Sequence, residues 1–176
     1  MRAARMFIAL IILTAPQIFR GQTVKCPKLP DKYKWESGKE YKRDEELVLR
    51  TLQWLTVTPL SSDILLRGKA NLFVMEWICG SPRIEIRIDS DILPFYIDYP
   101  DLLFPYIHGI ARCKLGKKTD CSELQAMISG FECVAYMIQT DEELKRAKQL
   151  QPIVKAYKKN KLEPFVESLM KNKTEK

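Results

Sequence analysis

One stretch of this sequence alternates apolar and charged residues in the manner of a β-strand, and no second stretch of comparable quality exists. From Arg83 to Asp89 the order is RIEIRID, so isoleucines and charges would point to opposite faces of an extended chain. A lone strand leaves its peptide groups without partners, so it must pair with something or run as an irregular connector. A sheet larger than one strand pair is therefore excluded, and helices must carry the fold.

Apolar residues recur at helical spacing through most of the remaining chain. This pattern predicts an all-α fold, an irregular or orthogonal multi-helix bundle with one short extended segment near 83–89. The expected helices span about 43–57, 61–79, 91–96, 98–115 and 121–138, then a polar helix after Thr140, and finally 162–170.

Punctuating residues set the expected helix boundaries. Gly80 stands where a left-handed C-cap belongs. Thr119 or Asp120 is expected to open the helix at 121–138, and Thr140 is expected to open the polar helix. A glutamate stands close behind each of them, as in a capping box. Pro152 is expected to interrupt that polar helix.

The N-terminus has the layout of an export signal. Arg2 and Arg5 precede a short apolar run, residues 6–15, which Pro16 ends. A run of this length suits a cleaved signal core, whereas a membrane-spanning helix needs about 20 apolar residues. We expect cleavage near Gly21; an uncleaved anchor and an internal chain are the alternatives. The expected organisation is a signal peptide at 1–21, an extended arm at 22–42, a single helical domain at 43–171 and a charged tail at 172–176.

Charge argues against a nucleic-acid partner. The formal net charge is +7, and loss of the three arginines within residues 1–21 lowers it to +4. The remaining excess lies mainly in KAYKKNK, residues 155–161, without the dense basic stripe and interleaved aromatics typical of nucleic-acid binding. On a helix such a run is a solvated face, with mild attraction to anionic surfaces.

Five cysteines, an odd number, allow at most two disulfides within one chain. Cys121 and Cys133 are about 18 Å apart if they share one helix, so they cannot bond to each other. Cys113 and Cys121 flank a short loop between two expected helices and form the most plausible pair. Each cysteine is equally well explained as a small buried hydrophobe.

No catalytic, cofactor or metal site is expected from the motifs. His108 is the single histidine, and nothing in the sequence brings it to Cys79 as a nucleophile pair needs. One histidine and scattered cysteines give no close-spaced zinc ligands. Paired carboxylates stand at expected helix starts, where the helix dipole already explains them: Asp89 and Asp91, Asp98 and Asp101, Glu142 and Glu143.

The alternating stretch has three interpretations. The preferred interpretation is a connector packed on helices by its isoleucines. An edge that pairs with another chain comes second, and a strand of a small hairpin is the remaining alternative. The edge interpretation and the basic run together define the expected interaction surface: Ser81, Arg83, Glu85, Arg87, Lys155, Lys158 and Lys159.

Four segments of the chain resemble a family of small exported helical proteins of Bacteroidota-type bacteria. They are TLQWLTVTPL, EWICGSPRIEIRID, YPDLLFPYIHGIARC and KAYKKNKLEPFVESL. W-x-x-G-S-P and P-D-L-L are the most specific pieces, and the resemblance covers about 40–170. It implies export to the periplasm or beyond and a helical domain, and it implies no activity and no site residues.

The leading hypothesis is a non-enzymatic, exported helical protein that binds a protein or an envelope component. It contacts no nucleic acid, and it meets a membrane only through the signal segment if that segment is uncleaved. Two alternatives remain open, a hydrolase of envelope polymers and a carrier of a small molecule or lipid. A carrier would require an apolar cavity among the helices.

Overall fold

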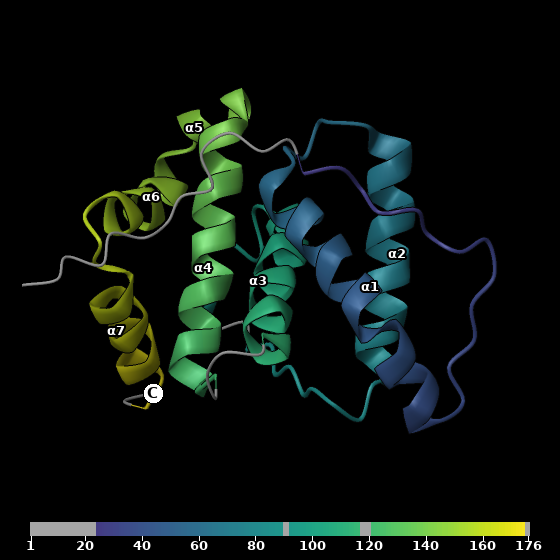
Figure 1. Ribbon diagram of the computed structural model, residues 1–176. Coiled ribbons are helices and arrows are strands. Elements are labelled where there is room, and N and C mark those ends of the chain that lie inside the picture. Colours follow the sequence, from purple (N-terminus) through teal and green to yellow (C-terminus); the bar gives the residue numbers. More distant parts are fainter. Residues whose placement is uncertain (1–23, 90–91, 117–120, 175–176) are drawn as a thin grey trace, which may run out of the picture.

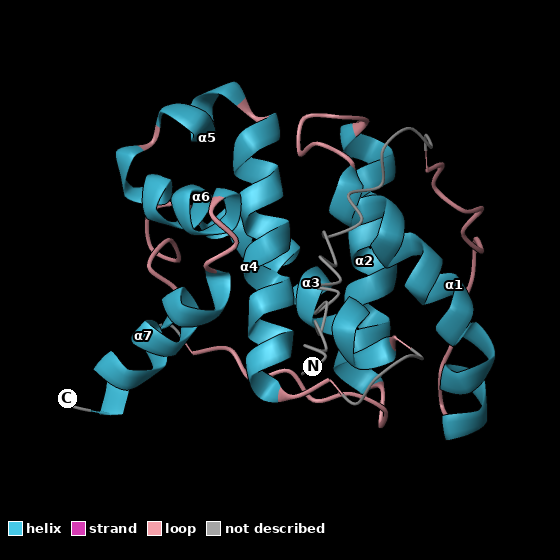
Figure 2. Ribbon diagram, turned by 60° about the vertical axis from the view of Figure 1, so that its left-hand side comes forward, coloured by secondary structure: helices cyan, strands magenta, loops and turns pink. Residues whose placement is uncertain are grey.

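The computed structural model of the protein is an all-α helical bundle, as the sequence predicts (Figure 1). It describes residues 24–89, 92–116 and 121–174, with side chains as far as Lys171, and this part of the chain contains no β-strand (Figure 2). No helix in this part is long and apolar enough to cross a membrane. The expected signal peptide lies outside the described residues.

The elements are α1 (Gly38–Val57), α2 (Ile64–Gly80), η2 (Pro100–Leu102), α3 (Leu103–Leu115), α4 (Glu123–Thr140), α5 (Glu142–Arg146), η3 (Lys148–Leu150), α6 (Gln151–Lys158) and α7 (Leu162–Thr174), where η denotes a 3-10 helix.

Helix α3 is buried on two faces and joins two apolar clusters. Tyr106 and Ile110 belong to a cluster shared with α4, α6 and α7. Ile107, Ala111 and Leu115 belong to a cluster shared with α1 and α2. Figure 1 shows α1 and α2 on one side of the α3–α4 pair, and α6 and α7 on the other. A helix that is apolar on both faces takes such a central place because each face must be covered.

Glycines bring α3 and α4 into main-chain contact. A Cβ atom added to Gly109 would lie 2.2 Å from the backbone oxygen of Ser129, and one added to Gly130 would lie 2.6 Å from the Tyr106 ring. Both distances are well inside van der Waals contact, so neither position has room for a side chain. The two glycines therefore set the distance between the helices.

A buried arginine joins the end of α1 to α2. Arg67 is 4% exposed and donates hydrogen bonds to the main-chain oxygens of Thr58, at 2.6 Å, and Leu55, at 3.2 Å. The Tyr136 hydroxyl of α4 donates to the Val57 oxygen at 3.0 Å. The last carbonyls of a helix have no partner within it, and these side chains supply the missing donors. Burial lowers the pKa of Arg67, but a guanidinium keeps its charge at neutral pH.

Helix α1 begins earlier than expected, at Gly38 rather than near Arg43. The Glu40 carboxylate accepts a hydrogen bond from the Ser37 N–H at 2.9 Å, as in a capping box. Hydrogen bonds from the N–H groups of Glu36 and Ser37 lower the pKa of Glu40. The expectation of an extended arm over 22–42 is thus wrong for its last five residues, because the cap signal at Ser37 outweighs the acidic run that follows it.

The arm before α1 packs on the bundle through aromatic rings. Tyr33 and Trp35 stack with ring centroids 4.7 Å apart, and Tyr33 meets Phe73 of α2 edge to face at 5.0 Å. The Trp35 indole N–H donates to the Asp44 carboxylate at 2.8 Å. The arm is therefore part of the second apolar cluster.

The expectation that Gly80 adopts a left-handed C-cap is wrong. Gly80 is the last residue of α2, its φ is not in the left-handed region, and Ser81 follows with φ −73°. A Cβ added to Gly80 would lie 1.9 Å from the Tyr41 hydroxyl oxygen. The glycine is needed because the Tyr41 side chain lies against it.

Three boundaries in the C-terminal part also differ from expectation. Asp141, and not Thr140, caps α5, because its carboxylate accepts from two N–H groups of the first turn. Pro152 lies in the first turn of α6, where its missing N–H costs nothing, so it starts a helix instead of interrupting one. Helix α7 continues to Thr174, so most of the expected tail at 172–176 is helical.

Two further boundaries lie between the connector and α4. The described part of the expected helix at 91–96 forms turns. Helix α4 is capped by Ser122, which forms a capping box with Gln125. The expected caps Thr119 and Asp120 lie outside the described residues.

The close contact of α3 and α4 predicts opposite effects of alanine at two helical glycines. Gly109→Ala should lower the free energy of unfolding by about 1–3 kcal/mol, because the added methyl group overlaps the α4 backbone. Gly68 is helical and exposed, with nothing within 4 Å of an added Cβ. Gly68→Ala is the matched control and should stabilise by about 0.5–1 kcal/mol. Urea unfolding followed by circular dichroism measures both; equal effects of the two substitutions would contradict the proposed contact.

Candidate interaction surface

The segment Ser81–Asp89, called the connector from here on, leads from α2 toward α3 without forming a helix or a strand. The connector interpretation therefore describes it, and the hairpin interpretation is wrong within the described residues because no strand lies beside it. Ile84 packs on the cluster of α1 and α2, and Ile86 contacts both clusters. Glu85 and Arg87 are exposed. From Ile84 to Arg87 the side chains thus alternate between the bundle and the solvent, as in an extended chain.

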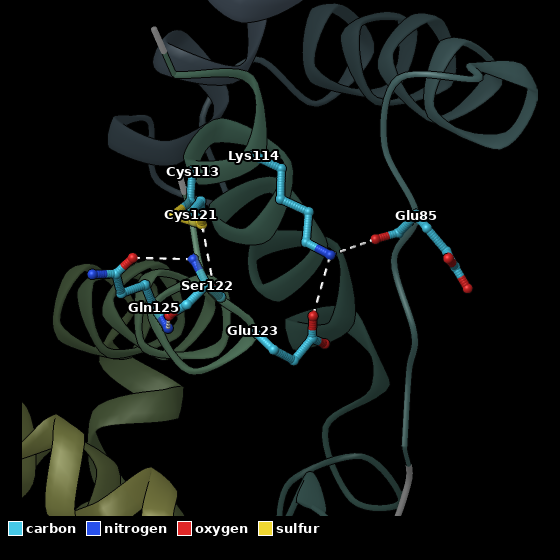
Figure 3. Close-up of a disulfide and its surroundings, with 7 residues drawn as sticks. All are labelled: Glu85, Cys113, Lys114, Cys121, Ser122, Glu123 and Gln125. Atoms are coloured by element: carbon cyan, nitrogen blue, oxygen red, sulfur yellow. Dashed lines mark hydrogen bonds and ion pairs between the residues drawn. A yellow bond between two sulfur atoms is a disulfide. The ribbon is translucent and has the colours of Figure 1, made fainter. Parts of the chain in front are cut away.

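Two ionic contacts hold the connector to the helices. The Lys114 ammonium of α3 donates to the Glu85 main-chain oxygen at 2.6 Å and lies 3.3 Å from a Glu123 carboxylate oxygen of α4 (Figure 3). Arg83 Nε lies 3.3 Å from Glu45 Oε2 of α1, an ion pair without hydrogen-bond alignment. The connector is therefore fastened at two points by three helices.

A disulfide lies beside the first of these contacts. Cys113 and Cys121 are joined in the structure with their Cα atoms 5.8 Å apart, the pair that the sequence favoured. The bond ties the end of α3 to the start of α4, next to Lys114 and Glu123, as Figure 3 shows. Closing so short a loop contributes about 2–3 kcal/mol by restricting the unfolded chain. Among the described residues, the free cysteines are Cys26, Cys79 and Cys133.

Most peptide groups of the connector have no hydrogen-bond partner within the described part of the chain. The Arg83 N–H donates to the Ser81 hydroxyl at 3.2 Å, and the Glu85 oxygen accepts from Lys114. The N–H and C=O groups of Ile84, Ile86 and Ile88 form no bond within the same part. In an extended chain, the peptide groups of successive residues point to opposite edges. With the Glu85 oxygen bonded to Lys114 of α3, an extended connector presents the isoleucine peptide groups on its other edge.

The residues expected to form the interaction surface divide into three groups. Ser81 is 8% exposed and binds its neighbour, so its expected place on the surface is wrong. Arg83, Glu85 and Arg87 are exposed, and Arg87 Nε lies 2.9 Å from a Glu85 carboxylate oxygen. The third group, called the basic group from here on, is exposed on and just after α6: Lys155, Lys158 and Lys159. Figures 1 and 2 show α6 and α2 on opposite sides of α4, so the basic group is separate from the start of the connector.

Sequence reasoning missed the residues that position the connector. Lys114, Glu123 and Glu45 come from three helices, and nothing in their local pattern points to a contact with the connector. The only available signal was the position of Lys114 next to a cysteine of the expected disulfide.

His108 is fully packed inside the bundle. It is 0% exposed, and neither ring nitrogen has a hydrogen-bond partner among the described residues. Burial, with a smaller contribution from the Arg67 charge, lowers its pKa to about 3. Cys79, by contrast, is exposed at the end of α2. A histidine sealed from solvent has no route to a substrate proton, so its setting counts against a nucleophile pair.

A cluster of polar side chains, partly or fully buried, lies between α3, α4 and α6: Arg112, Glu132, Cys133 and Tyr157. Burial raises the pKa of Glu132, against the opposing charge of Arg112, and raises that of Cys133 to about 11. Tyr157 also has a raised pKa, first through burial and then through Glu132. Arg112 donates to the Thr56 hydroxyl at 3.2 Å. Within the described residues, no group of three His, Cys, Asp or Glu side chains is placed to hold a metal ion.

A shallow hollow lies on the surface between the arm and α2. It is lined by Asp31, Lys32, Tyr33, Lys34 and Glu76. Burial and a hydrogen bond to Glu76 raise the pKa of Tyr33 to about 12. Four of the five lining residues are charged, whereas a carrier of a lipid needs an apolar interior.

No family model matches the chain, and neither the curated proteins nor the solved structures contain a match.

Buried, neutral His108 predicts a pH-dependent loss of stability. An unfolded histidine takes up a proton near its ordinary pKa of 6.5, while His108 in the fold stays neutral down to about 3. The contribution of His108 to the free energy of unfolding is therefore complete above pH 6.5. It declines as the pH falls below that value, by up to about 1.4 kcal/mol per pH unit. His108→Leu removes this dependence and the unpaired nitrogens, and should match or exceed wild-type stability at pH 7. Urea unfolding between pH 7 and pH 4 measures the difference between the two proteins; parallel curves would contradict the assigned state of His108.

Proposed function

We propose that this protein is an exported, non-enzymatic binding protein that recognises a protein partner in the cell envelope through its connector. The observation that carries the proposal is the row of unbonded peptide groups at Ile84, Ile86 and Ile88. Such an edge binds an added strand, whose main-chain hydrogen bonds supply affinity. The exposed charges of Arg83, Glu85 and Arg87 then supply specificity.

Export is supported by two features of the chain. The first 21 residues have the layout of a signal peptide. The Cys113–Cys121 disulfide suits an oxidising compartment, such as the periplasm or the exterior of the cell. The N-terminal sequence of the protein recovered from cells tests this part of the proposal, which requires that it begin near Gln22 and not at Met1.

A second candidate surface is the basic group on and after α6. Lys155, Lys158 and Lys159 are exposed, and none of their ammonium groups forms an ion pair with a described residue. Unpaired cations of this kind favour contact with an anionic component of the envelope. The two surfaces are separate, so substitutions can test them one at a time.

The hydrolase alternative receives less support than the binding proposal. It needs His108 or Cys79 to meet a carboxylate in an open cleft, and His108 is fully buried.

The test is capture of a partner from the native envelope by the tagged protein under mild cross-linking. We expect one stoichiometric protein partner, lost with Arg87→Glu, which reverses an exposed connector charge. Lys158→Glu is the matched control, because it makes the same exposed change on α6, and it should retain the partner. Loss with Lys158→Glu alone would move the function to the basic group, and capture of no partner by the wild type would overturn the proposal.

A further inference from the structure

The connector is complementary in charge to a second copy of itself. We propose that two copies of this protein pair through their connectors as antiparallel strands, with the two Ile86 residues opposite each other on a two-fold axis. This inference deepens the proposed function, on which it rests, because it names the partner as a second copy of the chain.

The sequence of the connector sets this register. With Ile86 at the centre, Glu85 lies opposite Arg87 of the second copy, and Arg83 lies opposite Asp89. Ile84 lies opposite Ile88. Every directly opposed charged pair has opposite signs, and such pairs stabilise a strand pair. A two-fold axis repeats each contact, so one favourable pair occurs twice.

Neighbouring registers place like charges together. Centring the pair on Glu85 would set Glu85 against Glu85 and Arg83 against Arg87. Centring it on Arg87 would set Arg87 against Arg87 and Glu85 against Asp89. A shift by one residue would bring isoleucines opposite charges and turn them to the wrong face. The charge pattern thus favours one antiparallel register above its neighbours.

The hydrogen bonds of the connector agree with the same register. In an antiparallel pair, alternate residues exchange both N–H···O=C bonds with the residue opposite. Here Ile84, Ile86 and Ile88 would do so, and their N–H and C=O groups form no bond among the described residues; the main-chain groups of Arg87 and the Glu85 N–H form none there either. Glu85 and Arg87 would form the pairs without main-chain bonds, where side chains come closest. Glu85 can do this while its oxygen accepts from Lys114 on the α3 side (Figure 3).

Pairing also covers an exposed apolar side chain. Ile88 is 44% exposed, and in this register it would lie against Ile84 of the second copy. One strand pair buries less area than a standard protein interface of about 1,600 Å². We therefore expect a weak dimer, with a dissociation constant of roughly 10 µM to 1 mM.

The test is a charge exchange measured by sedimentation velocity. Wild-type and variant proteins are expressed from the full coding sequence, purified, and followed from about 10 µM to about 1 mM. Arg87→Glu sets Glu85 against a glutamate of the other copy, and should raise the dissociation constant about tenfold or more. The double variant Glu85→Arg, Arg87→Glu restores opposite charges within a pair of identical chains, and should return to within about threefold of wild type. Lys158→Glu is the matched control and should not change the constant, and far-ultraviolet circular dichroism checks that each variant is folded.

Each outcome is informative. A protein that stays monomeric over the whole range overturns self-pairing, and so does a double variant that dimerises no better than the single one. The exchange restores opposite charges only within a pair of identical variant chains, so recovery by the double variant is read from sedimentation of the purified protein. In the capture experiment the double variant should recover neither a different protein partner nor a wild-type second copy, because both keep their own charges. Dependence of capture on Arg87 without dimer formation would sustain the binding function and refute the second copy as partner.

Discussion

The buried guanidinium of Arg67 holds together the part of the bundle on which everything else rests. Arg67 is 4% exposed, and its guanidinium donates hydrogen bonds to two carbonyl oxygens at the end of α1. Leaving a buried charge without such partners would cost several kcal/mol, so α2 must meet α1 where those carbonyls are available. Tyr136 of α4 and Arg112 of α3 add bonds to the same turn of α1, at Val57 and Thr56. The end of α1 therefore has polar contacts with three other helices.

The connector owes its exposure to this arrangement. Helix α3 must cover both apolar clusters, and the glycine contact at Gly109 keeps α4 against it. The chain leaving α2 then crosses outside the helices, anchored by Ile84, Ile86 and the Lys114 contact. The described part of the bundle contains no strand with which the connector could pair. The outer peptide groups of the connector therefore bind solvent or another chain, and this links the fold to the proposed binding function.

The sequence predicted the features that depend on local pattern. Apolar spacing gave the five long helices, because a buried face must repeat with the helical period. The loop between Cys113 and Cys121 gave the cysteine pair, because two helix ends joined by a short loop lie close together. The lack of a second alternating segment gave the connector as the preferred interpretation.

The features that depend on contacts distant in sequence were not predicted. Gly80 lacks a side chain because Tyr41, 39 positions earlier, lies against it, which no local rule reveals. Ser81 looked like a surface residue but is covered, and the Lys114 contact with Glu85 spans 29 residues. The early start of α1 differs from these, because the capping pair Ser37 and Glu40 that fixes it is local and visible in the sequence.

Hydrogen exchange of the connector amides in dilute solution is the most direct test of this account, since its central claim is that the connector edge is open. The amides of Ile84, Ile86 and Ile88 should exchange close to the rate of an unstructured peptide. Those of Ile107 to Ala111 in α3, buried between both clusters, should be slower by several orders of magnitude. Strong protection of the three isoleucine amides in the monomer would contradict the account, because it would mean that the edge is already paired within its own chain.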